Sequence, residues 1–309
     1  MALSITDILA ASYPAVMKSK PENQWAESAV LRIMEKQGFV KREDLGATIE
    51  VTLDYLINPG AEFLASDITP TSQSKTSVLG AASYDIAELS VPMVWTKKDE
   101  VRNPSQNAKV KYVKSLIENG SASHDQLVER SLFASSATQG MLSLPLLMSE
   151  DGTGTVGGIV SGTDTMWKSQ FDDYGDATAL LASLATVDNA CKKGSGGSAP
   201  TLIVTSATAH GVLEGKLVAN QRFGDANEAN AGFKVLKHRG ADVVFSNEYT
   251  SDSYFFLNPK AVQIIVSKGN FRSREETTPI PGYHAFESKI YSAMQLVTGN
   301  RSRLGVSFT

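Results

Sequence analysis

Cysteine is nearly absent from this sequence: Cys191 is the single one among 309 residues. One cysteine excludes an internal disulfide and a zinc site built from cysteine ligands. Long apolar runs are missing as well, because no uninterrupted stretch reaches about 18 apolar residues, so we expect no membrane span. The first residues have no basic side chain before their apolar positions and carry Asp7 among them, so we expect no signal peptide.

Positive charge is not in excess either. The chain has 29 Lys and Arg against 33 Asp and Glu, a formal net charge of -4. Nonspecific affinity for nucleic acid comes from clustered Lys and Arg, so this balance argues against a protein whose main task is to grip phosphates. The 42% hydrophobic content describes a globular chain long enough for a large core, or for two domains that share a sheet system.

No residue pattern predicts a metal or catalytic site. The histidines lie far apart in the sequence, without an i, i+4 pair, so nothing indicates that they converge on a metal ion. Ser206 and His210 are one helical turn apart, but no nucleophile elbow and no orienting acid accompany them. Cys191 falls on an apolar helix face and is interpreted as a small buried hydrophobe. The histidines are His124, His210, His238 and His284.

One glycine-rich segment matches a nucleotide-binding string. Gly152 to Gly157 reads G-T-G-T-V-G, which fits G-x-G-x-x-G. The dinucleotide fingerprint needs a helix that begins directly on the motif, so that its free amides meet the pyrophosphate. Here G-I-V-S-G follows, a poor helix, so we interpret the segment as a glycine-rich connection and keep a nucleotide-binding enzyme as an alternative function.

The first 45 residues indicate an arm with two short helices. A capping signal occurs at Ser4 to Asp7. A better helix is expected over residues 24–37, with Asn23 as its cap and Gly38 closing it. Its apolar face includes Trp25 and must be buried, either on the same chain or on a neighbouring subunit.

Residues 46–97 predict an extended β-hairpin. One strand alternates from Ile49 to Ile57 and includes Tyr55, and a second has Leu89 to Trp95 on one face. A polar tip with Lys75 joins them. Because an isolated hairpin is marginal in water, we expect a long one to find partner surface.

The rest of the chain predicts a helical stretch, a small α/β unit and returning strands. Residues 103–136 are helical, but Asn119-Gly120 is a helix-ending pair, so we expect an interrupted helix. A strongly amphipathic helix that Asp176 caps ends near Lys193, and a buried strand at 202–204 and another helix follow. The polar segment 221–231 precedes C-terminal strands with period-2 alternation, such as Leu304, Val306 and Phe308.

Two phrases in this order of elements carry a resemblance. They are G-G-I-V-S-G-T-D-T-M-W-K-S-Q at 157–170 and the C-terminal run that begins F-K-V-L-K-H-R-G-A-D-V-V-F at Phe233. With the short strands around them they resemble the major capsid proteins of tailed bacteriophages, which share the Hong-Kong-97-type shell fold. The resemblance covers most of the chain. It implies an α+β fold with an N-terminal arm (1–45), an extended β-hairpin loop (46–97), a peripheral domain with a long spine helix (98–145 and 285–309), and an axial α/β domain with connecting segments (146–284).

The resemblance also implies a structural function and no enzyme activity. We expect a major capsid protein that self-assembles into hexamers and pentamers of an icosahedral phage head enclosing double-stranded DNA, assembled in the host cytoplasm and located in the virion. Its expected partners are copies of itself, a portal, decoration proteins and a separate scaffolding protein or none, with no cofactor and no membrane. The alternative within the same fold is an encapsulin-type nanocompartment shell that holds a protein cargo.

Candidate intersubunit contacts follow from residue type and position. Aromatic side chains are enriched at the centres of interfaces, although each is equally compatible with a core position. Some members of the family crosslink a lysine of the extended loop to an asparagine of another subunit, but nothing here identifies a partner, so we predict no crosslink. The candidates are Trp25, Tyr55, Lys75, Trp95, Trp167, Phe223, Arg301 and Arg303.

Overall fold

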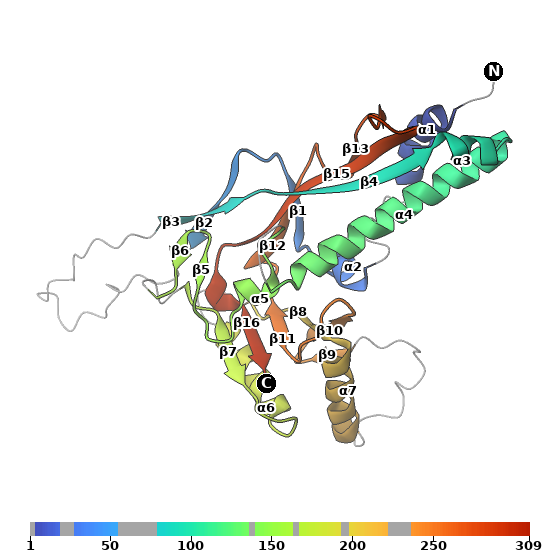
Figure 1. Ribbon diagram of the computed structural model, residues 1–309. Helices are drawn as coiled ribbons and strands as arrows, with labels where there is room; N and C mark the ends of the chain where they lie inside the picture. The colour runs from blue at the N-terminus through green and yellow to red at the C-terminus, as the bar shows by residue number, and fades with distance from the viewer. Residues whose placement is uncertain are drawn as a thin grey trace, which may run out of the picture.

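The computed structural model describes residues 4–18, 28–54, 79–135, 140–162, 167–192, 198–221 and 236–309. Within them the chain forms a long arm joined to a more compact lower unit (Figure 1). Two long strands, β4 (Ala87–Thr96) and β15 (Ala285–Thr298), form the arm, and helix α4 (Gln106–Leu132) lies along them. The C-terminus lies in the lower unit, in the last strand of a second sheet.

Strand β15 organises the first sheet. Its first part pairs antiparallel with β4, from Ala285 opposite Thr96 to Met294 opposite Ala87, and its second part pairs with β12. Side chains on β4 alternate between buried and exposed toward its end, as the period-2 pattern predicts. The remaining strands of this sheet pair with β12 or β15: β1 (Val40–Glu43), β12 (Val262–Ser267), β13 (Ser273–Arg274) and β14 (Thr278–Pro279).

The second sheet lies between two parts of the core. One face, with Ile203 and Phe256, packs under two helices, while the other face, with Val204 and Phe255, belongs to the main core. The parallel pair β8 and β10 is connected through α7, so the predicted βα alternation after residue 200 is confirmed. In order the strands are β7 (Gln170–Asp173), β16 (Gly305–Phe308), β11 (Tyr254–Leu257), β8 (Leu202–Ser206), β10 (Ala241–Ser246) and β9 (Leu236–His238), with helices α6 (Leu180–Cys191) and α7 (Ala207–Gln221).

Several shorter elements complete the described chain. Two small antiparallel pairs stand apart from the main sheets: β2 (Thr48–Asp54) with β3 (Leu79–Asp85), and β5 (Thr155–Val156) with β6 (Ile159–Val160). The other helices are α1 (Ile5–Lys18), α2 (Ala29–Lys36), α3 (Lys97–Arg102), α5 (Leu144–Leu147) and the 3-10 turn η3 (Arg301–Arg303). The capping signal of the first helix is confirmed, because the Asp7 amide donates to Ser4 Oγ and the Ser4 amide donates to the Asp7 carboxylate.

The pairing predicted for the extended hairpin is wrong in one strand. Strand β2 pairs with β3, from Thr48 opposite Asp85 to Asp54 opposite Leu79. The run from Leu89 to Trp95 is instead β4, which pairs with β15. The sequence of β3, L-G-A-A-S-Y-D, has small residues where a strand usually has branched or aromatic ones, so it gives no strand signal. Residues 55–78 lie outside the described part of the chain.

The interruption predicted for the spine helix is also wrong, because α4 runs continuously through Asn119 and Gly120. Gly120 is buried against the sheet, where a Cβ atom would come within 3.0 Å of Ile290 Cδ1 and 3.4 Å of Met93 Cγ. The glycine therefore serves close packing of helix on sheet and does not end the helix.

Neither of two predicted N-cap residues caps its helix. Ser28 caps α2, with the Leu31 amide donating to Ser28 Oγ at 3.1 Å, whereas Asn23 and Trp25 lie outside the described residues. The apolar face of α2 packs into the main core of the same chain. Of the two predicted alternatives, burial on the same chain therefore holds for the described part of this helix. Asp176 does not cap α6; its carboxylate accepts from the Thr178 amide at 2.6 Å, four residues before the helix begins.

The sheets divide the chain differently from the predicted domain boundaries. Strands β12 to β14, within 146–284, belong to the first sheet together with β4 and β15. Strand β16, within 285–309, belongs to the second sheet. The chain thus passes between the two sheets more than once after residue 146, and η3 lies at one of these crossings.

Enlarging Gly120 is expected to destabilise the chain. In Gly120→Val the new side chain meets Ile290 and Met93, and such overpacking typically costs about 1–3 kcal/mol. Asn119→Val is the matched control. Asn119 is exposed on the same helix, and a valine there carries the same helix penalty for β-branching without meeting the sheet. Urea unfolding followed by circular dichroism measures both, and equal midpoints for the two variants would contradict the close packing of α4.

Candidate assembly surfaces

Several contacts hold the base of the extended loop on the body. On β3, the Ser83 amide donates to Gly157 O at 3.1 Å. The Tyr84 hydroxyl donates to Thr298 O at 2.8 Å and accepts from the Thr298 amide at 3.3 Å. On β2, Val51 lies over Gly299, where a Cβ atom would come within 3.2 Å of Val51 Cγ1. Burial raises the pKa of Tyr84, so its hydroxyl stays neutral and keeps both bonds.

Arg301 is the buried cation of this region. It lies in η3, between the first and second sheets, and its side chain is fully buried. Its Nε donates to Leu147 O at 2.6 Å and one terminal nitrogen donates to Thr153 O at 2.7 Å. Longer contacts reach Gly154 O, Trp167 O and Ser149 Oγ at 3.4–3.5 Å. Burial lowers the pKa of Arg301 from its ordinary value, and the Asp151 charge opposes that shift.

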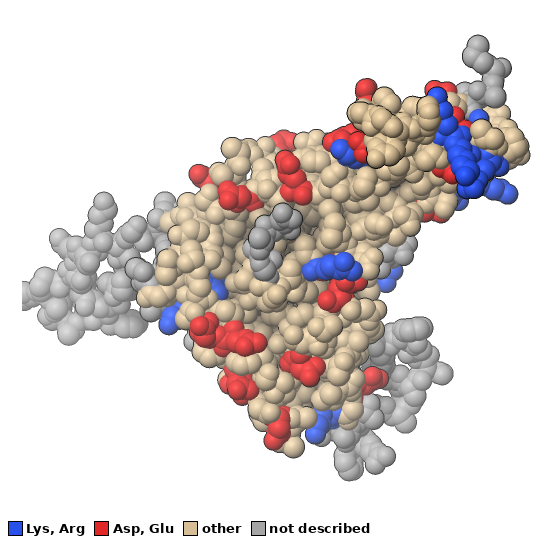
Figure 2. Space-filling model, viewed as in Figure 1, with Lys and Arg blue, Asp and Glu red and all other residues tan. Residues whose placement is uncertain are grey.

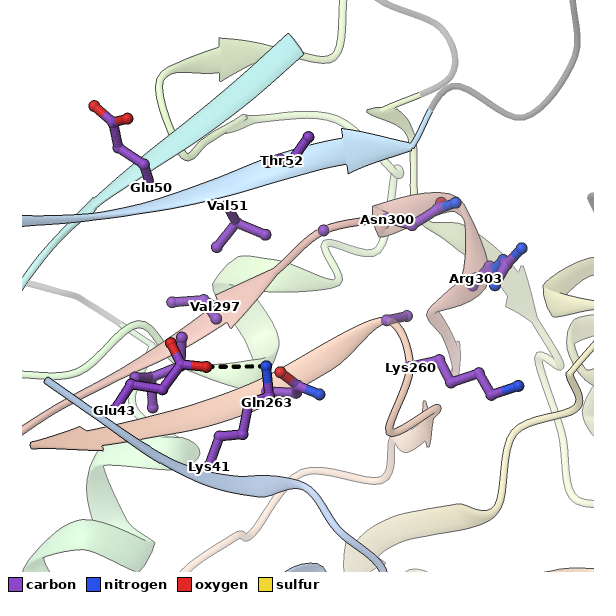
Figure 3. A pocket seen from close by; sticks show the side chains of 13 residues that line it. Lys41, Glu43, Glu50, Val51, Thr52, Lys260, Gln263, Val297, Asn300 and Arg303 are labelled. Atoms are coloured by element: carbon purple, nitrogen blue, oxygen red, sulfur yellow. Dashed lines mark ion pairs between the residues drawn. The ribbon is translucent and has the colours of Figure 1, made fainter. Parts of the chain in front are cut away.

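A groove of about 290 Å³ runs between the loop base and the first sheet (Figure 3). Lys260 and Arg303 lie at one end, and Glu50 on β2 at the other. Inside it, Lys41 Nζ and the Glu43 carboxylate form an ion pair of 2.9 Å on β1. The groove thus offers both charge signs on its walls.

The far end of the arm is basic. Helix α3 has no buried residue, and its Lys97, Lys98 and Arg102 are all exposed. Figure 2 shows Lys and Arg gathered at this end, whereas Asp and Glu are the more frequent charges over the visible face of the lower unit. Val101 on the same helix is 78% exposed. A capping box between Thr96 and Asp99 gives α3 a defined shape although it buries nothing.

A polar cluster is buried beneath the spine helix. The Asp125 carboxylate pairs with the Arg272 guanidinium, and both residues are less than a tenth exposed. His124, fully buried, places Nδ1 3.3 Å from Asp125 Oδ1 and Nε2 2.9 Å from Ser292 Oγ. Tyr13 of α1 donates to Arg272 O at 2.7 Å, which ties the first helix to this cluster. Burial is the main reason that the pKa of His124 is lowered, so the ring is neutral at pH 7.

The predicted contact residues are not gathered in one place. Trp95, Trp167 and Arg301 are each at most 3% exposed within the chain, so as placed they contribute to its own core. Arg301 donates to main-chain carbonyls of its own chain. Arg303 is half-buried and lines the groove. The other four, Trp25, Tyr55, Lys75 and Phe223, lie outside the described residues.

Sequence reasoning missed the loop base and the buried polar cluster. The pair Gly157-Gly158 between branched residues carried a usable signal, because two glycines between short strands favour a two-residue hairpin turn. The Gly157 contact with β3, the Tyr84 hydroxyl bonds and the Asp125–Arg272 pair join segments far apart in the chain. No local pattern indicates them.

The geometry gives no support to a nucleotide site in the glycine-rich segment. Gly152 to Gly157 leads into β5 and β6, not a helix, and the Thr153 and Gly154 carbonyls accept from Arg301. A phosphate would need amide donors at this place. Over the described ranges, no group of three or more His, Cys, Asp or Glu side chains is placed to hold a metal ion. No helix there has the length and hydropathy to cross a membrane.

Solved shell proteins share this architecture. The capsid protein of cyanophage A-1(L) superposes with a TM-score of 0.61 at 16% identity, covering 89% of this chain and 92% of that one. The capsid of an empty GTA particle gives 0.59 at 10% identity, covering 89% and 94%. The SrpI encapsulin complex from Synechococcus elongatus gives 0.53 at 10% identity, covering 89% and 86%.

These matches establish the fold. The chain has the Hong-Kong-97-type shell fold, a mixed α+β architecture, so the fold class predicted from the sequence is confirmed. At the sequence level no family model matches the chain, and no curated protein does. The fold is therefore preserved at identities where little of the side-chain detail is shared.

Acid is expected to destabilise the chain through His124. Its folded-state pKa is lowered, so below about 6.5 the unfolded state binds the proton more tightly and stability is lost as pH falls. One such group contributes a slope of up to about 1.4 kcal/mol per pH unit. His124→Gln should flatten the fall of the urea midpoint between about pH 7.5 and pH 5.5.

The exposed His284 provides the control. His284→Gln should leave the pH dependence of the urea midpoint as in the wild type. If His124→Gln also follows the wild-type curve, the buried ring does not titrate in the way its surroundings indicate.

Proposed function

We propose that this chain is the major capsid protein of a tailed-phage-type particle, assembling into hexamers and pentamers of an icosahedral head that encloses double-stranded DNA. The observation that carries the proposal is the shell fold over 89% of the chain, with phage capsid proteins among the matches. The phage capsids of cyanophage A-1(L) and phage XM1 match with TM-scores of 0.61 and 0.54.

The parts of the subunit take distinct mechanical roles in this proposal. The arm of β4, β15 and α4 forms the peripheral domain, and the second sheet with α6 and α7 forms the axial domain around the capsomer axis. The loop that leaves the body through β2 and β3 reaches the neighbouring subunit. The groove beside its base, lined by Lys41, Glu50 and Arg303, is an acceptor surface for a neighbour.

An encapsulin-type nanocompartment shell is the second candidate. The supporting observation is the SrpI encapsulin match, which covers the same 89% of this chain as the capsid matches. The two candidates share the fold of the subunit and differ in what the shell holds, so particle contents distinguish them.

Electron microscopy of the recombinant chain tests shell formation. We expect shells or capsomer rings after size-exclusion chromatography, from the chain alone or coexpressed with its neighbouring genes. Nuclease-protected DNA of phage length in native particles supports the capsid, whereas a stoichiometric protein cargo supports the nanocompartment. A chain that stays monomeric or dimeric under every condition contradicts both.

Removing the extended loop is expected to abolish assembly but not folding. Asp54 and Leu79 face each other at the ends of β2 and β3, so an Asn-Gly turn can replace residues 55–78. The variant should keep its circular dichroism spectrum and elute as small species, because the body retains its core. Shells of normal size from this variant would show that the loop is not an assembly element.

A further inference from the structure

The turn of the β5–β6 hairpin touches the base of the extended loop. Gly157 and Gly158 form its two-residue turn, with φ of 59° and 78°, the left-handed values of a type I′ turn. Gly157 is pressed against β3: a Cβ atom on it would lie 2.7 Å from Ala82 Cβ and 2.9 Å from the Tyr84 ring. A Cβ atom on Gly158 would meet no other atom within 4 Å.

The contact also includes a main-chain hydrogen bond. The Ser83 amide belongs to β3 and donates to Gly157 O at 3.1 Å. At this bond the turn lies so close to β3 that a side chain on residue 157 would collide with Ala82 and Tyr84. The hairpin therefore fixes where β3 lies, as well as filling space beside it.

Arg301 anchors the end of the hairpin opposite the turn, and Trp167 holds β5 next to the turn. Arg301 donates to Thr153 O and Gly154 O, the two residues directly before β5. Trp167 Nε1 donates to Val156 O at 3.1 Å within the hairpin. Because Arg301 and Trp167 are buried, these bonds join the hairpin to the interior of the subunit.

We propose that the β5–β6 hairpin is a bracket that sets the direction in which the extended loop leaves the subunit, with Gly157 as the positioning residue and Arg301 as its anchor. Tyr84 on Thr298 and Val51 over Gly299 hold the loop base from the body side, and Gly157 limits β3 through Ala82 and Ser83. The bracket is a property of the single subunit. Its consequence for shells rests on the proposed function.

The two turn glycines give a matched pair of variants. Gly157→Ala and Gly158→Ala both place a side chain at positive φ, which costs roughly 1–2 kcal/mol in each. Only Gly157→Ala adds the collision with Ala82 and Tyr84. Hydrogen exchange of the peptide covering β3 is the primary readout, measured on unassembled subunits at low concentration, with the thermal midpoint measured beside it.

We expect the β3 peptide to exchange about tenfold faster in Gly157→Ala than in Gly158→Ala, which corresponds to about 1.4 kcal/mol of local stability. Ala82→Gly removes the nearer collision and should restore part of the protection in Gly157→Ala. Equal exchange in the two single variants overturns the bracket, because turn strain alone then accounts for any change.

Assembly provides the second readout. If wild-type chain forms shells, Gly157→Ala should give aberrant or fewer particles while Gly158→Ala assembles as the wild type does. Normal particles from Gly157→Ala, despite faster exchange at β3, overturn its role in directing the loop. If the wild type forms no shells while the exchange difference holds, the bracket stands and the proposed function fails.

Discussion

A buried guanidinium that donates mainly to main-chain carbonyls lies where the chain passes from the first sheet to the second. Arginine has five N–H donors in a fixed planar fork. Those of Arg301 face four main-chain carbonyls and one hydroxyl, from α5, from the glycine-rich segment and from the residue Trp167. An ammonium group in its place has three donors diverging from one nitrogen and does not match this set.

The direction of these hydrogen bonds shows that the glycine-rich segment presents acceptors, not donors, at this place. Its string fits a phosphate-binding fingerprint, in which amides point at an anion. In the folded chain Thr153 and Gly154 turn their carbonyls toward a cation of the same molecule. As in nucleotide-binding loops, the glycines allow positive φ angles and close approach of the backbone. Here the group that the backbone contacts is the guanidinium of Arg301 in the same chain.

Features of the fold that depend on neighbouring residues in the sequence could be predicted, whereas features that depend on contacts between distant segments could not. Alternation along β4 and the apolar faces of α2 and α6 are local patterns, and they predicted these elements well. Gly120 was misjudged because a glycine that ends a helix and one that lets a helix approach a sheet look alike without the partner. Strand β3 was missed because its small residues reflect the hairpin turn that presses on it, about 75 residues later in the chain.

The arm and the lower unit meet through contacts of very different strength. At Arg301 a full charge is buried. Moving Arg301 away from its carbonyl partners leaves a desolvated cation or unpaired carbonyls, and removing one partner of a buried charge costs several kcal/mol.

At the end of α4, by contrast, Gln126 and Arg130 bond Glu248, and Arg130 is mostly exposed. An exposed pair contributes about 0–1 kcal/mol. Breaking the Arg301 contacts therefore costs more than breaking the Glu248 contacts. Because the bracket and the loop base lie on the Arg301 side, the base of β2 and β3 rests on the stronger of these two sets of contacts.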